Sequence, residues 1–187
     1  MKRSLFTAVT MALLFSCNNA AETKTTVPAT APATGQSTPS TPGPGGTTIQ
    51  VTLTGGANAG SYSATSAEAT CSMGLTGPKS FGNQYSVAGK ADNEFSSLQL
   101  IVDDYEAAKS GTEKFYIKVA FGKRLEGNKY EINGSDNSLA GKKQGSGKLT
   151  IHESGSTKTA TIEGKTADGV TIDATLTCSA VITAQGN

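Results

Sequence analysis

The 187-residue chain has no tryptophan, only one histidine and only three cysteines. This short supply leaves few side chains for a transition-metal site or for acid–base catalysis. An excess of charge of either sign is also lacking, because sixteen lysines and arginines stand against fifteen acidic residues. That balance removes the basic surface expected of a nucleic-acid-binding protein, so we expect no nucleic-acid partner. The length suits one folded domain.

The chain also lacks an apolar run long enough to cross a bilayer, which takes about 20 residues. Its apolar stretch over residues 4–15 follows the basic start Lys2-Arg3 and fits the core of a secretory signal peptide. The stretch ends in Leu14-Phe15-Ser16-Cys17, which resembles the bacterial lipobox. We therefore predict a lipoprotein signal peptide over residues 1–16 and acyl chains, of the palmitate type, on Cys17. The alternative is ordinary cleavage near Asn19-Ala20-Ala21.

Acyl chains on Cys17 would form a membrane anchor, since one chain holds weakly whereas two or three hold firmly. Residues 17–46 contain five of the six prolines in the chain, one valine and no other large apolar residue. Such a segment cannot bury enough surface to offset its chain entropy. We predict a disordered tether, for which O-glycosylation is the alternative to a plain spacer. The expected location is the bacterial cell envelope, with the domain facing the exterior or the periplasm.

Residues 47–187 change to a period of two, in which apolar and polar residues alternate. Val170–Cys178 is the clearest run, and strict alternation predicts a strand with one buried and one solvated face. The other expected strands are 47–54, 61–65, 67–75, 84–89, 96–102, 115–121, 129–133, 147–153 and 157–164. Only Asp103–Ser110 favours a short helical turn. We predict one all-β domain, an antiparallel β-sandwich, with a small β-barrel as the alternative.

Once Cys17 is assigned to lipid, Cys71 and Cys178 remain. Cys178 has the parity of the apolar residue Leu176, and Cys71 has the parity of Met73, so both side chains are expected to point inward. An exported protein meets an oxidising compartment, in which such a pair forms a disulfide. We predict a Cys71–Cys178 bond that closes a loop of about 107 residues.

Several short motifs fit one known plan. They are Leu14–Cys17, the tether over 23–46, Tyr130-Glu131-Ile132 before Asn133-Gly134, and Leu176-Thr177-Cys178. Together they resemble the lipoprotein-antigen type known from mycobacteria, in which a lipobox and a tether precede a small β domain with one early and one C-terminal cysteine. This resemblance implies a surface-exposed, non-enzymatic lipoprotein.

A few polar segments could carry chemistry, and each has a simpler interpretation. Gly141–Lys148 could contact an anion, but a flexible loop between strands is favoured. Asn133-Gly134-Ser135 matches the N-glycosylation triplet and is read as a turn. Possible calcium ligands are Asp103, Asp104, Glu106, Asp136 and Asn137. They lack the spacing of a calcium loop, and the first three fit better as negative charge at a helix N-terminus.

The leading functional hypothesis is a membrane-anchored, non-catalytic β domain that binds a protein or another partner. An alternative is a carrier that encloses a lipid or other apolar ligand in a hollow interior, lined by Leu98, Leu100, Val102, Phe115 and Val119. A thiol enzyme or hydrolase is the third hypothesis, and it lacks an evident nucleophile–base pair, since only His152 could serve as the base. We predict no catalytic residue, no cofactor and no metal site.

Overall fold

The structure, a computed structural model of this chain, describes residues 45–123 and 126–184. The predicted signal peptide over 1–16, the lipid-bearing Cys17 and the tether up to residue 44 lie outside the described residues, so they stay predictions. Strand β1 begins at Thr47, directly after the predicted tether. Within the described ranges, no helix is long and apolar enough to cross a membrane.

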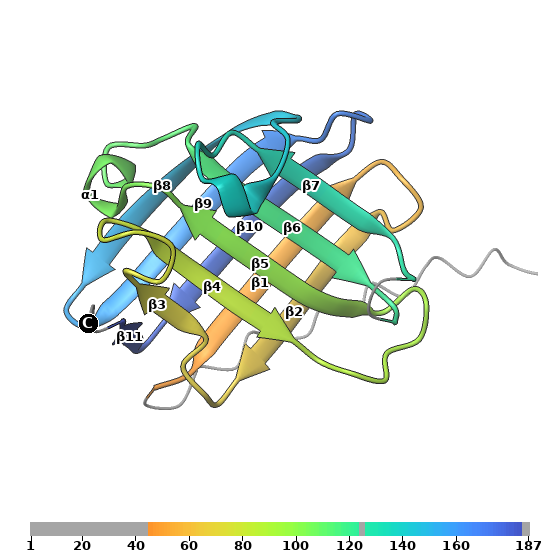
Figure 1. The fold of residues 1–187 in the computed structure, drawn as a ribbon. Coiled ribbons are helices and arrows are strands. Elements are labelled where there is room, and N and C mark those ends of the chain that lie inside the picture. The colour runs from red at the N-terminus through yellow and green to blue at the C-terminus, as the bar shows by residue number, and fades with distance from the viewer. Residues whose placement is uncertain (1–44, 124–125, 185–187) are drawn as a thin grey trace, which may run out of the picture. The chain divides into compact units, whose positions relative to one another are not determined.

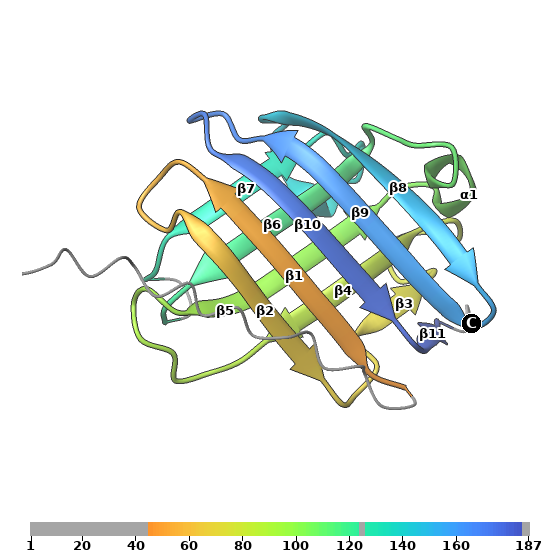
Figure 2. The ribbon, with the colours of Figure 1, turned by 180° about the vertical axis from the view of Figure 1, so that it is seen from behind.

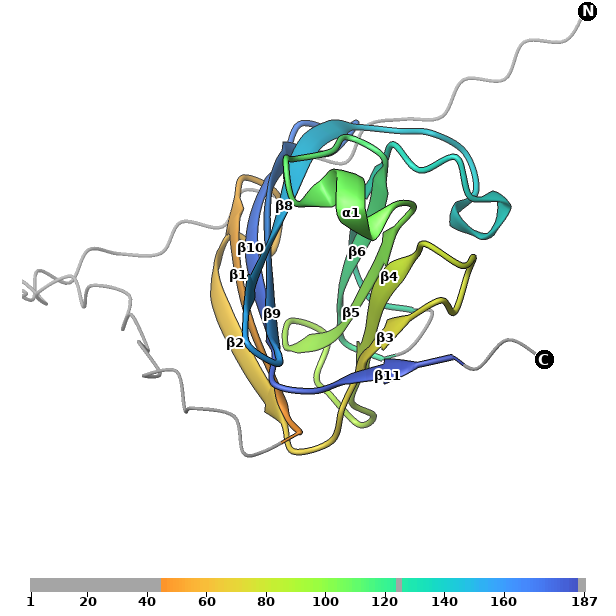
Figure 3. The same ribbon diagram turned by 90° about the vertical axis from the view of Figure 1, so that its left-hand side faces the viewer.

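Eleven strands in the described residues form two sheets that face each other (Figure 1, Figure 3). The five-stranded sheet, seen from its outer side in Figure 2, has the order β2-β1-β10-β9-β8. Its strands are β1 (Thr47–Thr54), β2 (Gly60–Ser66), β8 (Ser146–Ser154), β9 (Thr157–Lys165) and β10 (Thr171–Cys178). The predicted all-β sandwich is confirmed, and the two separate sheets exclude the alternative barrel for this part of the chain.

The six-stranded sheet has the order β11-β3-β4-β5-β6-β7. Its strands are β3 (Cys71–Met73), β4 (Phe81–Ser86), β5 (Phe95–Val102), β6 (Phe115–Phe121), β7 (Lys129–Asn133) and β11 (Val181–Thr183). In the part of the chain that the structure describes, two short helices lie in the connections, α1 (Tyr105–Ala108) and the 3-10 helix η1 (Ser138–Ala140). Strand partners are antiparallel except β11 and β3, which run parallel.

The alternation of apolar and polar residues explains which side chains of the five-stranded sheet are buried. Ile49 lies opposite Leu176, and Val51 lies opposite Ala174 in the antiparallel pair of β1 and β10. All four of these side chains are buried against the other sheet. The intervening positions carry mostly threonine, whose branched Cβ suits a strand and whose hydroxyl suits water. The sequence pattern alone therefore decides which face of this sheet is buried.

The core lies between the two sheets and contains side chains from both. The five residues expected to line a hollow interior, Leu98, Leu100, Val102, Phe115 and Val119, are each at most 1% exposed and belong to the same core cluster. They pack against the buried apolar face of the five-stranded sheet. A ligand between the sheets would have to displace these side chains.

The predicted disulfide is confirmed. Cys71 in β3 belongs to the six-stranded sheet, Cys178 in β10 belongs to the five-stranded sheet, and their Sγ atoms are bonded. Both residues are completely buried. The bond therefore connects the two layers of the sandwich covalently, across 107 residues of sequence.

Three strands differ from the expectation. The strand expected over 84–89 begins and ends three residues earlier, at Phe81–Ser86, because its pairing with β5 ends where Ser86 lies opposite Ser97. The strand expected over 67–75 is reduced to Cys71–Met73, because Gly74 takes a positive φ of 79° and ends it. Strand β11 was not expected, since its three residues are too short to show an alternation. Val181 pairs with Cys71 across the parallel β3–β11 contact. The short tail after Cys178 thus extends the six-stranded sheet by one edge strand.

Candidate functional site: the outer face of the six-stranded sheet

The structure does not bring His152 to either of the cysteines that a thiol enzyme would use. Cys71 and Cys178 share their disulfide, so neither sulfur is free to act as a nucleophile. His152 is exposed on β8, where it lies beside Thr159 of β9 on the outer side of the five-stranded sheet. The arrangement therefore lacks the contact between nucleophile and base that such chemistry needs.

The carboxylates considered for calcium bind groups of their own chain. Asp103 accepts hydrogen bonds from Ser135 and from the backbone N–H of Asp136 at 2.7 Å. Asp104 caps α1, as the helix-terminus interpretation predicts. Asp136 lies 2.8 Å from the ammonium group of Lys114 and also pairs with Lys143, and these lysines lower the pKa of its carboxyl to about 2.

The remaining two candidates are structural as well. Glu106 pairs with Lys109 at 3.0 Å, and the Asn137 side chain caps η1 through the N–H of Leu139 at 2.9 Å. Over the residues that the structure describes, no group of three or more His, Cys, Asp or Glu side chains is arranged to hold a metal ion.

Asn133 of the glycosylation triplet is 1% exposed. Its Nδ2 donates to three backbone carbonyl oxygens, those of Ala140 at 2.9 Å, Gly141 at 3.2 Å and Lys142 at 2.9 Å. Its Oδ1 accepts from the N–H of Ser135 two positions later, which is the turn expected of this triplet. A side chain engaged in this way organises the loop between β7 and β8 and is shielded from modification in the folded domain.

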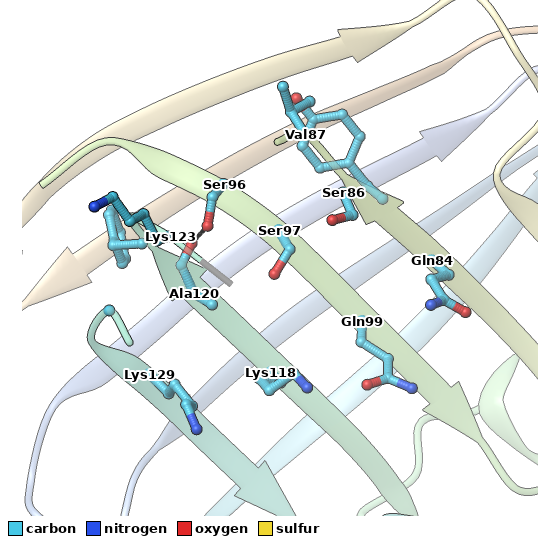
Figure 4. Close-up of a pocket in the computed structure, with 13 residues that line it drawn as sticks. Gln84, Ser86, Val87, Ser96, Ser97, Gln99, Lys118, Ala120, Lys123 and Lys129 are labelled. Atoms are coloured by element: carbon cyan, nitrogen blue, oxygen red, sulfur yellow. Dashed lines mark hydrogen bonds between the residues drawn. The ribbon is translucent and has the colours of Figure 1, made fainter. Parts of the chain in front are cut away.

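A shallow hollow lies on the outer face of the six-stranded sheet, over β4, β5, β6 and β7 (Figure 4). We call it the basic hollow, and its volume is about 340 Å³. Strand register builds it, because Gln84 lies opposite Gln99, and Gln99 lies opposite Lys118. Neighbouring strands are about 4.8 Å apart, so these side chains form one row across the sheet. A second row contains Ser86, Ser97, Ala120 and Lys129.

The charge in the basic hollow has one sign. Lys118, Lys123 and Lys129 line it, and no described residue of its lining carries a carboxylate. The nearest acidic side chain along the rows is Glu131, which lies opposite Lys118 on β7. Its carboxylate accepts from Gln144 at 2.8 Å and from the Tyr116 hydroxyl at 3.4 Å. Burial, and then the Glu131 charge, raise the pKa of Tyr116 to about 12.

A second, larger hollow of about 770 Å³ continues over the same face towards β3 and β11. We call it the apolar hollow, because three large hydrophobic side chains line it. They are exposed to solvent: Leu75 is 66% exposed, Leu139 75% and Ile182 57%. These side chains come from three separate segments: the loop after β3, η1 and β11. The Nδ2 of Asn137 donates to the carbonyl of Thr76 at 3.1 Å and so ties the first two segments together.

Sequence reasoning missed both hollows. The alternation within 96–102 and 115–121 does place Ser97, Gln99 and Lys118 on the solvated side of their strands. It does not show that they lie in one row, because a row depends on which strands pair and in which register. Of the two leucines of the apolar hollow, Leu75 lies in a loop and Leu139 lies in the three-residue helix η1, and neither segment is long enough to show a periodicity.

Comparisons of the chain with protein families, with curated proteins and with solved structures find no match. The resemblance to the lipoprotein-antigen type therefore stays a prediction that rests on the short motifs of the sequence.

Proposed function

We propose that this protein is a bacterial envelope lipoprotein, held to a membrane by acyl chains on Cys17, whose β-sandwich is a non-catalytic module that binds an anionic ligand. The lipobox at Leu14–Cys17 and the proline-rich tether support the anchored arrangement. A tether of about 29 residues spans roughly 30 Å as a flexible coil, which lifts a domain clear of the lipid headgroups.

The basic hollow is the observation that carries the binding proposal. Three lysines line the β6–β7 side of the basic hollow, beside amide and hydroxyl groups from residues such as Gln84, Gln99 and Ser97. Ammonium groups attract phosphate, carboxylate or sulfate, and the neutral groups can donate further hydrogen bonds to the same oxygen atoms. A phosphate-bearing or carboxylate-bearing ligand is therefore the chemical class that this surface suits best.

A carrier with its ligand inside the sandwich is the second candidate from the sequence. The positions expected to line its cavity are packed into the core, with Phe115, Val102 and Val119 completely buried. A ligand on the outer face displaces none of them. For this reason we place the ligand outside the sandwich, where both hollows open to solvent.

Replacement of the lipid-bearing cysteine tests the anchor. In the native host, Cys17→Ala is expected to abolish acylation, seen as the loss of the acyl mass by mass spectrometry, and to move the protein into the soluble fraction. Ser16→Ala is the matched control, since it keeps a small residue beside the cleavage site. Membrane association of Cys17→Ala at the wild-type level would refute the anchor.

Titration with pyrophosphate, followed by amide chemical shifts in NMR spectra, tests the anionic ligand. Lys118→Gln and Lys129→Gln should each weaken binding by up to about fivefold, the usual range for an exposed ion pair. Lys165→Gln removes the same charge from the exposed end of β9 and should change little. Equal effects of all three substitutions would mean that only net charge matters and that the basic hollow is not a site.

A further inference from the structure

The exposed apolar side chains of this domain are concentrated on one surface. Four large hydrophobic residues are exposed in the described part of the chain. Leu75, Leu139 and Ile182 line the apolar hollow, and Val87, 39% exposed, lines the basic hollow. The outer face of the five-stranded sheet carries none of them. Exposed apolar area gathered in this way marks a binding surface more often than a solvated one.

The two hollows are parts of one continuous groove. Gln84, Ser86 and Gln99 belong to the lining of both. The groove therefore runs across the outer face of the six-stranded sheet, from the lysines on β6 and β7 to the apolar side chains beside β3 and β11. Three strand spacings separate β6 from β3, a distance of about 14 Å. An alkyl chain of medium length covers that span.

Charge divides the groove as sharply as hydrophobicity does. All three lysines of the two linings lie in the basic hollow. The one carboxylate in either lining is Glu68, which belongs to the apolar hollow. A ligand with a negative group is therefore oriented, since its charge is attracted to the basic hollow and repelled from the far end.

We infer that the ligand of this face is an anionic amphiphile: a phosphate or carboxylate group in the basic hollow, and a single alkyl chain in the apolar hollow. This inference rests on the proposed function and narrows its ligand class. A small amphiphile fits better than a protein surface, because hollows of several hundred cubic ångströms are typical of small-molecule sites, whereas protein interfaces are flatter. The alkyl chain would cover Leu75, Leu139 and Ile182, which water now contacts.

Isothermal titration calorimetry on the full chain carrying Cys17→Ser tests the inference, with all probes kept below their micelle concentrations. The probes are octyl phosphate, inorganic phosphate, which lacks the chain, and octyl glucoside, which lacks the charge. We expect octyl phosphate to bind at least about tenfold more tightly than either of the others, since only part of an octyl chain needs to be buried for that gain.

Two substitutions separate the ends of the groove. Leu139→Ser should remove most of the advantage of octyl phosphate over inorganic phosphate and leave the binding of inorganic phosphate unchanged. Lys118→Gln should weaken both phosphate probes and leave octyl glucoside unchanged. Leu139→Met, which keeps an apolar side chain, and Lys165→Gln are the matched controls. Both Leu139 and Lys165 are exposed, so neither change disturbs the core.

The outcomes are distinct. Equal affinities for octyl phosphate and inorganic phosphate, both sensitive to Lys118→Gln, would overturn the amphiphile and leave the proposed anionic function standing. Failure of both phosphate probes to bind would overturn the two together. A peptide of alternating glutamate and leucine that binds more tightly than octyl phosphate would also overturn the inference, in favour of a protein partner.

Discussion

Glu153, near the end of β8, joins α1 to the β8–β9 hairpin. Its carboxylate lies 2.9 Å from the ammonium group of Lys109 and accepts hydrogen bonds from Tyr105 and Lys158 as well. These partners lower the pKa of the Glu153 carboxyl to about 2, and the hydrogen bond from Lys109 is the largest cause. The helix and the hairpin therefore share one ionised carboxylate.

A carboxyl whose pKa is lowered by folding stabilises the folded state above its unfolded pKa, and it loses this effect as the pH falls through its folded pKa. For Glu153 the stabilisation is therefore lost over a pH window that runs from 4.5 down to about 2. We expect Glu153→Gln to lower the free energy of unfolding at neutral pH, and the difference from the wild type to shrink across the window. Urea titrations of both proteins at a series of pH values measure this difference in the free energy of unfolding.

The matched control is Glu163→Gln, a change on the exposed outer face of β9 that should have little effect at any pH. The Glu153 assignment fails if the difference between Glu153→Gln and the wild type stays constant down to about pH 2. Asp136, whose pKa is also lowered to about 2, is present in both proteins and cancels from this comparison.

Asn133 shows what a single buried amide can organise. Replacing it with alanine leaves three carbonyl oxygens of residues 140–142 and one N–H without their partner. Since each lost hydrogen bond costs about 0.5–1.5 kcal/mol, we expect Asn133→Ala to lower the free energy of unfolding by about 2 kcal/mol. Asn93→Ala, in the exposed loop between β4 and β5, is the control. Equal midpoints of urea unfolding for the two variants would contradict this role.

At the scale of single residues, the sequence predicted the features that depend only on the alternation of inward and outward side chains within one strand. The inward direction of Cys71 and Cys178 follows from their strand neighbours, and the disulfide follows from that direction. The row of Gln84, Gln99 and Lys118 depends on residues distant in sequence, and the bonds of Asn133 to the carbonyls of residues 140–142 depend on the path of an irregular loop. No pattern within one segment contains that information.

The elements themselves were largely predictable, because a strand with one buried face shows its period in its own sequence. The two strands of the β8–β9 hairpin were predicted over 147–153 and 157–164, and Ser154 lies opposite Thr157 where the chain turns between them. The helix was predicted over 103–110, and α1 covers Tyr105–Ala108 within that range. The three-residue strands β3 and β11 are different, since sheet pairing rather than alternation defines them.

The N-cap of α1 gives a prediction at the scale of one element. The Asp104 carboxylate accepts from the N–H of Ala107 at 3.1 Å and lies 3.5 Å from the ammonium group of Lys79. We expect Asp104→Ala to lower the melting temperature by about 3 °C, because the helix loses its cap. Asp104→Asn keeps the acceptor and removes only the charge, so it should retain most of the stability. Equal losses in both variants, measured by circular dichroism, would assign the effect to the ion pair with Lys79.

At the scale of the molecule, the order of strands could not be predicted from the sequence. Strand β1 pairs with β10, so Thr47 lies opposite Cys178, and the short β11 returns to the other sheet beside β3. Such pairings join the two ends of the domain, and many different orders would bury the same alternating faces. The groove is a consequence of this order, since β3 to β7 must be neighbours before their outer side chains can form one surface.

The Cys71–Cys178 bond also joins segments that are distant in sequence, and it does so covalently. It closes a loop of 107 residues, and chain-entropy models assign a loop of that length up to about 4.7 kcal/mol of stabilisation. We expect the double variant Cys71→Ala, Cys178→Ala to lose about 3–5 kcal/mol of its free energy of unfolding, measured with urea, because it loses the crosslink and also the buried sulfur atoms of the core.

Cys17→Ala is the control, because it removes a cysteine without touching the bond and should leave the free energy of unfolding unchanged. Wild-type protein unfolded in the presence of dithiothreitol should lose less than the double variant, because it loses the bond and keeps both sulfur atoms in the core. If the double variant instead unfolds at the wild-type urea concentration, the packing between the sheets holds the sandwich together without the crosslink.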